Sequence, residues 1–378
     1  MAIYWKAYDQ SHSFAFAGIV LMAESIASAS TAGFRAMLID RKGLKLPLLF
    51  FAPAYAVGIF SFNLIHNQTL IVIGAAIFGL ASPPINLSAR PLWREVVNKE
   101  WIRTAYALDV TFMSTTSILG PSIATFIAAS KHPAYALNLT AALMLIGGLW
   151  MGNLKVAKNW KPVAKSSQKI KLFSLPEMQV LIAEGIIIGL GMGAEIIAIP
   201  SLATAQHVRN LSGVLLSIIG IANVVGSLIA GNISKHITPL SAFLRNYVLW
   251  SIAAIPICFV NFNLSIFIIG TILGLIGGAQ MVFYLELSDA VRPLGVATAL
   301  LGWLWTFEGS AQGVGQGIGG WMFQHLGIHT PFIFSAVTVF VGLNIIYLIK
   351  NIYTRLIVLF LNYKQKKRFM KIVWKEIN

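Results

Sequence analysis

Five acidic residues lie inside or beside apolar stretches of the sequence, where a charged side chain is costly. Glu24, Glu184, Glu195 and Glu308 are each surrounded by hydrophobic residues, and Asp109 lies close to the start of another such run. A carboxylate inside a membrane costs roughly 2.5–3.5 kcal/mol on insertion scales, so acids kept there are expected to serve a function. Because burial penalises the charged form, such a carboxyl can take up and release a proton. The chemistry that these residues predict is proton exchange.

The stretch that contains Glu308 also carries two patterns at helical spacing. Polar residues recur every four positions, and glycines recur beside them, which predicts a helix with a polar face on a cavity and a glycine face against a neighbour. The glycines are equally compatible with packing alone. Trp305 is a candidate for the wall of an apolar substrate pocket, with a lipid-facing position as the alternative. The polar stripe is Glu308, Gln312 and Gln316, and the glycine stripe is Gly309, Gly313 and Gly317.

Glu184 and Glu195 are eleven residues apart in one apolar stretch. Eleven residues make three helical turns, so the two carboxyls are expected on one face, about 16 Å apart along the axis. Glu195 and Asp109 are equally compatible with a role in holding one conformation. Glu308 and Glu24 are the first candidates for a role in transport.

The composition requires a membrane. The chain has 378 residues, of which 57% are hydrophobic and 11% charged, and its mean hydropathy is +0.76. Soluble domains are about 45–50% apolar and about 25% charged. Apolar runs of about twenty residues recur along the whole chain, and each is long enough to cross a hydrocarbon core of roughly 30 Å as a helix. The sequence therefore predicts an all-α polytopic membrane protein, since the alternating ten-residue segments of a membrane barrel are missing.

We predict eleven membrane-spanning helices in two bundles. The N-terminal bundle is expected at 1–153, a cytoplasmic linker at 154–175, a C-terminal six-helix bundle at 176–350 and a basic tail at 351–378. The tail is too charged to span again, so a helix lying on anionic lipid is expected there, with a disordered tail as the alternative. The predicted spans are 13–36, 46–66, 69–89, 105–129, 133–153, 176–203, 211–233, 244–262, 264–287, 295–323 and 330–350.

The formal net charge of +15 reflects topology and does not indicate nucleic-acid binding. Only Lys6, Lys131 and Arg209 fall on one side of the predicted membrane, which leaves 28 less three, or 25, basic residues on the other. Cytoplasmic loops carry the excess of Lys and Arg, so that side is predicted to be cytoplasmic. The linker and the tail then lie in the cytoplasm, and the N-terminus of this chain lies outside, in a plasma-membrane protein.

The sequence offers little for other kinds of chemistry. The single cysteine, Cys258, lies in an apolar run and cannot form an intrachain disulfide. No metal-ligand cluster, phosphate-binding loop or nucleophile motif appears, so we expect no metal, no cofactor and no enzymatic activity.

A charged turn follows the first predicted span. Asp40, Arg41, Gly43 and Lys45 form the pattern D-R-x-G-x-K, in which the glycine permits a tight reversal. The pattern resembles the turn between the second and third helices of the major facilitator superfamily, although the leading glycine and one arginine of that motif are replaced here. The resemblance implies two pseudo-symmetric helical bundles and a gating role for the aspartate, which in the family packs near a helix of the other half.

Two further stretches, 79–93 and 105–121, are similar to the fourth and fifth helices of bacterial facilitators, particularly actinobacterial efflux-type members. Gly120 and Pro121 match the first half of the family's antiporter signature, while Ala124 and Thr125 replace its second half. The resemblance implies export of a small molecule in exchange for another solute.

The charged turn comes one helix too early for the family. Only 39 residues precede Asp40, and residues 13–36 account for one span. The first twelve cannot cross a membrane and are expected to be the end of a first helix and its outer loop. We therefore expect the chain to lack most of the family's first helix, through a start assigned too late or a real truncation.

These observations predict a monomeric secondary transporter that works by alternating access. The expected activity is proton-coupled export of a small amphipathic or cationic molecule. One alternative is a metabolite uptake carrier of the same fold. Another is a membrane protein that does not transport, disabled by the loss of its first helix.

Overall fold

The computed structural model describes residues 1–85, 88, 92–93, 96–98, 102–128, 134–160, 176–233, 239–291 and 297–347. Within these ranges the regular structure is helical, which confirms the all-α prediction. Residues 161–175 of the predicted linker and the predicted tail at 351–378 lie outside the described residues.

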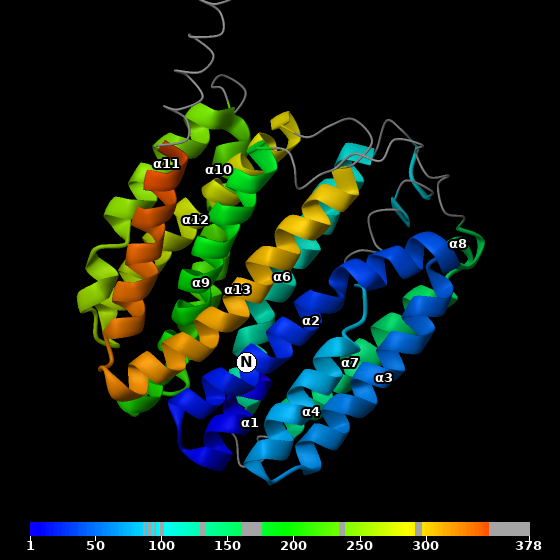
Figure 1. The fold of residues 1–378 in the computed structure, drawn as a ribbon, viewed down its shortest axis with the longest axis horizontal. Helices are drawn as coiled ribbons and strands as arrows, with labels where there is room; N and C mark the ends of the chain where they lie inside the picture. The colour runs from blue at the N-terminus through cyan, green and yellow to red at the C-terminus, as the bar shows by residue number, and fades with distance from the viewer. Residues whose placement is uncertain are drawn as a thin grey trace, which may run out of the picture.

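The helices before residue 160, which we call the first half, pack mainly through α2, α3, α4 and α7. They are drawn in blue to teal in Figure 1. The predicted spans of this half all contain a helix. The first half consists of α1 (Ala2–Ser11), α2 (Phe14–Lys42), α3 (Lys45–Leu64), α4 (Gln68–Leu80), α6 (Ile102–Ala128), α7 (Ala134–Asn153) and the short α8 (Lys155–Asn159).

The helices from residue 176 onward form what we call the second half, drawn in green to red in Figure 1. In the middle of the molecule α13 lies between α9 of its own half and α2 of the first half, and it packs closely on both. The second half consists of α9 (Pro176–Ala205), α10 (Leu211–Ile233), α11 (Pro239–Ala253), the 3₁₀ turn η4 (Pro256–Phe259), α12 (Leu264–Val291), α13 (Ala297–His325) and a last helix, Thr330–Tyr347.

Eight helices in the described part of the chain are long and apolar enough to cross a membrane. Two predicted spans contain a break in the helix close to a proline. The span predicted at 69–89 stops as α4 at Leu80, just before Pro83 and Pro84, and the span predicted at 244–262 is interrupted before Pro256. Proline lacks a backbone N–H and disfavours helical geometry in the residue before it, so helices end ahead of it.

The first twelve residues were predicted to end a helix and then form a loop, but most of them are helical. Helix α1 covers Ala2–Ser11, and His12 ends it in the left-handed region with φ 52°. Tyr4, Trp5 and Ala7 are completely buried against the first half. At ten residues α1 is too short to span a bilayer. The hypothesis that it ends a longer helix stays a prediction, which the gene sequence upstream of Met1 tests.

Glycines allow the long helices to touch backbone to backbone. A Cβ added at Gly278 of α12 would lie 1.8 Å from the carbonyl oxygen of Asn223 in α10, and one added at Gly193 of α9 would lie 2.0 Å from the carbonyl oxygen of Gln312 in α13. Between the two halves, a Cβ on Gly18 of α2 would lie 3.2 Å from the Cα of Gly320 in α13. The predicted stripe of Gly309, Gly313 and Gly317 also faces α2, where a Cβ on Gly313 would lie 3.0 Å from the Cβ of Ser25, so it is a helix-packing surface.

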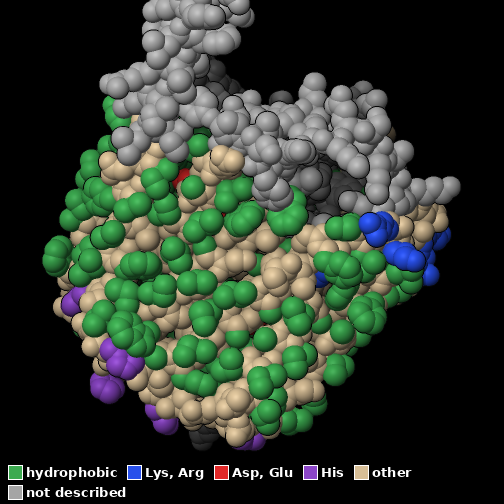
Figure 2. All heavy atoms as spheres, viewed as in Figure 1, with side chains coloured by type: hydrophobic (Ala, Val, Ile, Leu, Met, Phe, Trp, Pro, Cys, Tyr) green, Lys and Arg blue, Asp and Glu red, His purple; other side chains and the backbone are tan. Residues whose placement is uncertain are grey.

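Hydrophobic and charged side chains are unevenly distributed over the surface. The face in Figure 2 is largely hydrophobic, with Lys and Arg gathered at one end and His along the opposite edge. We call the two ends the basic end and the opposite end. The basic end is defined by the end of α2, the start of α3 and α8, which carry Arg41, Lys42, Lys45, Lys155 and Lys158. The opposite end is defined by the ends of α1, α3, α9 and α13, where His12, His66, His207 and His325 lie.

Candidate functional site

Glu184 and Glu308 come together inside the second half. Glu184 lies on α9 and is only 4% exposed, and Glu308 lies on α13. A Cβ on Gly185 would lie 3.6 Å from the Cβ of Glu308, so the two helices touch at this level. The two carboxyls are close enough for their charges to act on each other. Two of the predicted acids therefore form one site.

Two tyrosines complete this site, and the sequence reasoning missed both. Tyr247 of α11 donates its hydroxyl to Oε1 of Glu184 at 3.3 Å. Tyr284 of α12 is 7% exposed and lies within electrostatic reach of both carboxyls. Its hydroxyl is buried without a hydrogen-bond partner among the residues that the structure describes. The available signal was a tyrosine inside an apolar span, where a hydroxyl needs a partner. We call Glu184, Glu308, Tyr247 and Tyr284 the acid cluster.

No cation balances the acid cluster in the part of the chain that the structure describes, because neither Glu184 nor Glu308 forms an ion pair there. A buried, uncompensated carboxylate is strongly unfavourable, and two adjacent ones repel each other. A proton, or a positive charge placed beside the two carboxyls, would relieve this repulsion.

We expect the Tyr284→Phe substitution to separate packing from function. A buried hydroxyl without a partner costs about 1–3 kcal/mol, so its removal should leave the melting temperature unchanged or raise it. If the hydroxyl serves the site, transport should fall roughly fivefold, the effect of about 1 kcal/mol. The control is Tyr247→Phe, which removes the donor to Glu184 and should lower the melting temperature. Equal destabilisation by both substitutions would show that Tyr284 has an ordinary structural role.

Glu195 lies apart from the acid cluster, although it is on the same helix as Glu184. Its Oε2 accepts a hydrogen bond from Ser335 of the last helix at 3.2 Å. The two acids are three turns apart on α9, as predicted. They contact different helices, because Glu184 lies beside α11 and Glu195 beside the last helix. Glu195 has the surroundings of a residue that fixes one helix against another.

Glu24 lies at the contact between the two halves. The Ser25 hydroxyl donates to Oε1 of Gln316 on α13 at 3.0 Å, and Oε2 of Glu24 is the alternative acceptor at 3.5 Å. Three turns further along α2, Arg35 is 5% exposed and lies within electrostatic reach of Glu24. Its guanidinium donates to the backbone carbonyls of Ser28, Thr31 and Ser82. Arg35 was not singled out from the sequence, although a base inside an apolar span was the signal.

The polar stripe on α13 does not face one cavity. Glu308 meets α9, whereas Gln316 is buried against Ser25 of α2. Gln312 is half-buried between them. Trp305 is also half-buried and makes contacts of its own. The three residues therefore do not share one neighbouring helix, because α13 is packed on two sides, and their role at a cavity stays a prediction.

The charged turn folds as predicted. Arg41 and Lys42 end α2, and Lys45 begins α3. Gly43 joins the two helices with φ +80°, a conformation that favours glycine, and its N–H donates to the carbonyl of Ile39 at 2.9 Å. Asp40 lies in the last turn of α2, and its side chain is outside the described residues.

The antiporter-like residues lie on α6. Pro121 is inside the helix, and a Cβ on Gly120 would meet nothing within 4 Å, so this glycine leaves open space beside it. Asp109 is on the same helix, with its side chain outside the described residues. One turn beyond Pro121, Thr125 accepts a hydrogen bond from the indole N–H of Trp5 at 3.2 Å.

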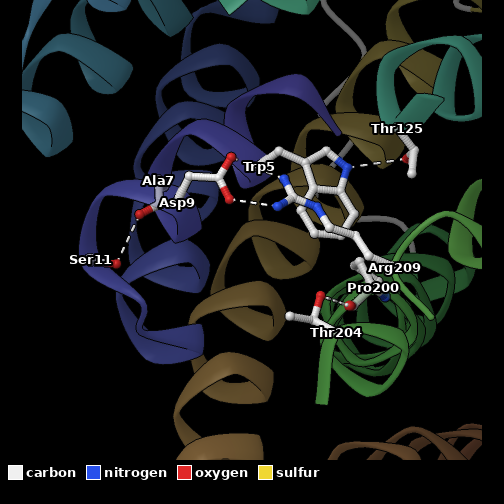
Figure 3. Close-up of polar contacts among 8 residues, drawn as sticks. All are labelled: Trp5, Ala7, Asp9, Ser11, Thr125, Pro200, Thr204 and Arg209. Carbon is white, nitrogen blue, oxygen red and sulfur yellow. Dashed lines mark hydrogen bonds and ion pairs between the residues drawn. The ribbon is translucent and has the colours of Figure 1, made fainter. Parts of the chain in front are cut away.

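Contacts at the opposite end join the two halves, and the sequence did not predict them. Arg209, between α9 and α10, pairs with both carboxylate oxygens of Asp9 on α1 at 2.7 and 3.0 Å (Figure 3). The hydroxyls of Tyr4 and Ser201 are 2.9 Å apart. Gln324 of α13 accepts a hydrogen bond from the hydroxyl of Ser13 at 2.7 Å. These bonds hold the halves together at this end.

A cavity of about 490 Å³ lies along the contact between α2 and α13, away from the acid cluster. Its lining is apolar and includes Ile19, Met22, Val314 and Trp321. None of the candidate acids contributes to it, so it does not have the polar groups that orient a charged substrate.

Comparison with known proteins identifies the family to which this chain belongs. The sequence profile described as Major Facilitator Superfamily matches residues 1–315. The chain belongs to the Major Facilitator Superfamily. This facilitator is therefore a multi-pass membrane transport protein and not an enzyme. The fold, with its two helical bundles, is that of the superfamily.

Solved structures of transporters share the fold of this facilitator. A point mutant of the nucleoside transporter NupG has a TM-score of 0.73 and 12% identity, over 92% of this chain and 94% of that one. A bacterial homologue of the human lysosomal transporter Spinster, in an inward-facing and occupied conformation, has a TM-score of 0.69 and 11% identity, over 93% of each chain. None of the curated proteins matches the sequence. At such identities the likeness concerns the fold alone.

Proposed function

We propose that this facilitator exports a small amphipathic or cationic molecule from the cell in exchange for protons. The observation that carries the proposal is the acid cluster, in which buried Glu184 and half-buried Glu308 lie at one level of the α9–α13 contact with no cation paired to them in the described part of the chain. A proton and a positively charged substrate both relieve the repulsion between the carboxyls. Each therefore disfavours binding of the other, which is the basis of exchange.

The arrangement of the two ends of the molecule supports export as the proposed direction. The basic end is cytoplasmic under the positive-inside rule, so the opposite end faces outward. The Asp9–Arg209 and Tyr4–Ser201 contacts close that outer end. A site closed to the outside is poised to receive its substrate from the cytoplasm. The half-present antiporter signature at Gly120 and Pro121 also favours exchange.

The other candidate residues have supporting roles in this proposal. Glu24 is a second proton site at the contact between the halves, and Glu195 and Asp109 hold helix positions. Asp40 and the charged turn gate the cytoplasmic end, as their resemblance to the family motif implies. The protein acts as a monomer in the plasma membrane.

We expect a proton gradient alone to drive accumulation of an amphipathic cation. The purified protein is reconstituted into proteoliposomes with an acidic lumen, and ethidium is added outside. Protons leaving the lumen should drive ethidium inward against its gradient, because the acid cluster exchanges one positive charge for the other. The measurement is the fluorescence of internal ethidium over time, compared with protein-free liposomes.

Nigericin provides the control in the presence of potassium, since it dissipates the pH gradient without touching the protein. Accumulation should then stop. Ethidium movement that is equal with and without the pH gradient would contradict proton coupling and favour a facilitated carrier.

A further inference from the structure

Arg209 connects the two halves through an ion pair with Asp9. It lies in the short connection between Ala205, where α9 ends, and Leu211, where α10 begins. Both terminal nitrogens of its guanidinium donate to the carboxylate of Asp9, at 2.7 and 3.0 Å. Two parallel bonds of this kind fix orientation as well as distance. The two side chains are 26% and 30% exposed, so the pair is partly sheltered from water.

Trp5 gives the same guanidinium a second contact with the first half. The carbon at the centre of the guanidinium lies 3.9 Å from the centre of the indole ring, a favourable cation–π distance. Trp5 is completely buried, and its N–H is bonded to Thr125 of α6. As Figure 3 shows, Arg209 reaches from the second half to a ring and a carboxylate that both belong to α1.

A second bond from α1 lies beside this pair. Tyr4 and Ser201 are both completely buried, and their hydroxyls are 2.9 Å apart. Tyr4 and Trp5 are adjacent on α1, and Asp9 follows one turn later. All the groups that bind the second half here therefore lie on one short helix, which packs on α2 and α6.

We infer that Asp9, Trp5 and Arg209 form a gate that controls how often this facilitator opens at the opposite end. The inference uses the alternating access of the transport fold and does not depend on proton coupling or on the substrate. Opening at that end separates α1 from the connection between α9 and α10, so both bonds of the ion pair and the ring contact must break together. The gate therefore favours the closed state, and weakening it shifts the population toward the open one.

The test measures opening at a buried position near the gate. Ile197 of α9 is completely buried and packs among residues of the first half. An Ile197→Cys reporter is introduced after the native cysteine is removed by Cys258→Ser. The rate of its reaction with N-ethylmaleimide then reports how often the halves separate there. Leu304→Cys, buried in the core of the second half, is the control reporter for general loosening.

We expect Asp9→Asn and Arg209→Gln each to raise the labelling rate at position 197 about five- to tenfold, since a sheltered bidentate pair with a ring contact is stronger than an exposed one. Labelling at position 304 should stay within about twofold of the parent. The exchanged pair, Asp9→Arg with Arg209→Asp, should bring labelling at position 197 back toward the parent rate, because the attraction is restored. Arg209→Lys should fall between the parent and Arg209→Gln.

Three results would contradict the inference that these residues form a gate. One is unchanged labelling at position 197 in both single variants. Another is labelling in the exchanged pair that equals or exceeds the sum of the single effects. The last is a parallel rise at positions 197 and 304 with a lower melting temperature, which would show that the pair only stabilises the fold. Failure of the ethidium assay with an intact gate response would refute the proposed exchange alone.

Discussion

Glu308→Gln is expected to abolish proton-driven transport while leaving the protein folded. An amide keeps the shape of the carboxyl but cannot bind or release a proton in this range. Glu308 has no ion-pair partner among the described residues, so the substitution removes a charge without leaving another one unpaired there. In the proteoliposome assay, ethidium accumulation driven by the pH gradient should fall about tenfold or more, whereas the melting temperature should stay the same or rise.

The matched control is Glu286→Gln. Glu286 lies on α12 near the basic end, outside the acid cluster, and the same chemical change there should leave accumulation within about twofold of the parent. Coupled transport that persists in Glu308→Gln would rule out Glu308 as the coupling residue. Glu24 on α2 would then be the next carboxyl to replace.

The largest loss of stability is expected from Gly278→Ala. The added methyl group would lie 1.8 Å from the carbonyl oxygen of Asn223 and 2.6 Å from its carbon. These are backbone atoms, so no side chain can rotate away, and α10 and α12 must move apart along their contact. We expect a loss above about 3 kcal/mol, at the upper end for overpacking in a core. The measurements are the yield of monodisperse protein in detergent and its melting temperature.

Gly147→Ala makes the same chemical change where there is room. Gly147 is on α7, and an added Cβ meets nothing within 4 Å. Because alanine favours helix over glycine, this variant should be unchanged or more stable by up to about 1 kcal/mol. Equal melting temperatures for the two variants would mean that α10 and α12 are not in backbone contact.

Helix type and most helix positions followed from the sequence because membrane-spanning helices carry their signal locally. Twenty apolar residues predict a span whatever surrounds them. The errors came where a local signal was overridden. The part of α1 that contains Lys6, Asp9 and Gln10 was predicted to be a loop after the end of a helix, but the burial of Tyr4 and Trp5 stabilises the whole segment as a helix.

The polar stripe of α13 shows why residues on one predicted face can be divided between two neighbours. With 3.6 residues per turn, each step of four residues rotates the side chain by roughly 40°, so Gln316 is turned by roughly 80° from Glu308. On a helix packed between two others, that rotation carries a side chain from α9 to α2. The spacing predicted the helix but not the neighbour of each residue.

Contacts between segments that are distant in the chain could not be predicted from the sequence. The sequence reasoning placed Asp9 and Arg209 on the same side of the membrane, yet 200 residues separate them in the chain. Tyr247 reaches Glu184 across 63 residues. Such contacts depend on which helices become neighbours, and one sequence alone does not encode that in its periodicity.

The contact between Gly18 and Gly320 has a mechanical consequence. Here α2 of one half and α13 of the other meet without side chains, since each glycine presents only its Cα to the other. Interlocked side chains must change rotamers when two helices roll over each other, and that repacking raises the barrier to motion. Bare backbone needs no such change. This contact can act as a pivot on which the two halves turn, with a low energy barrier and without loss of packing.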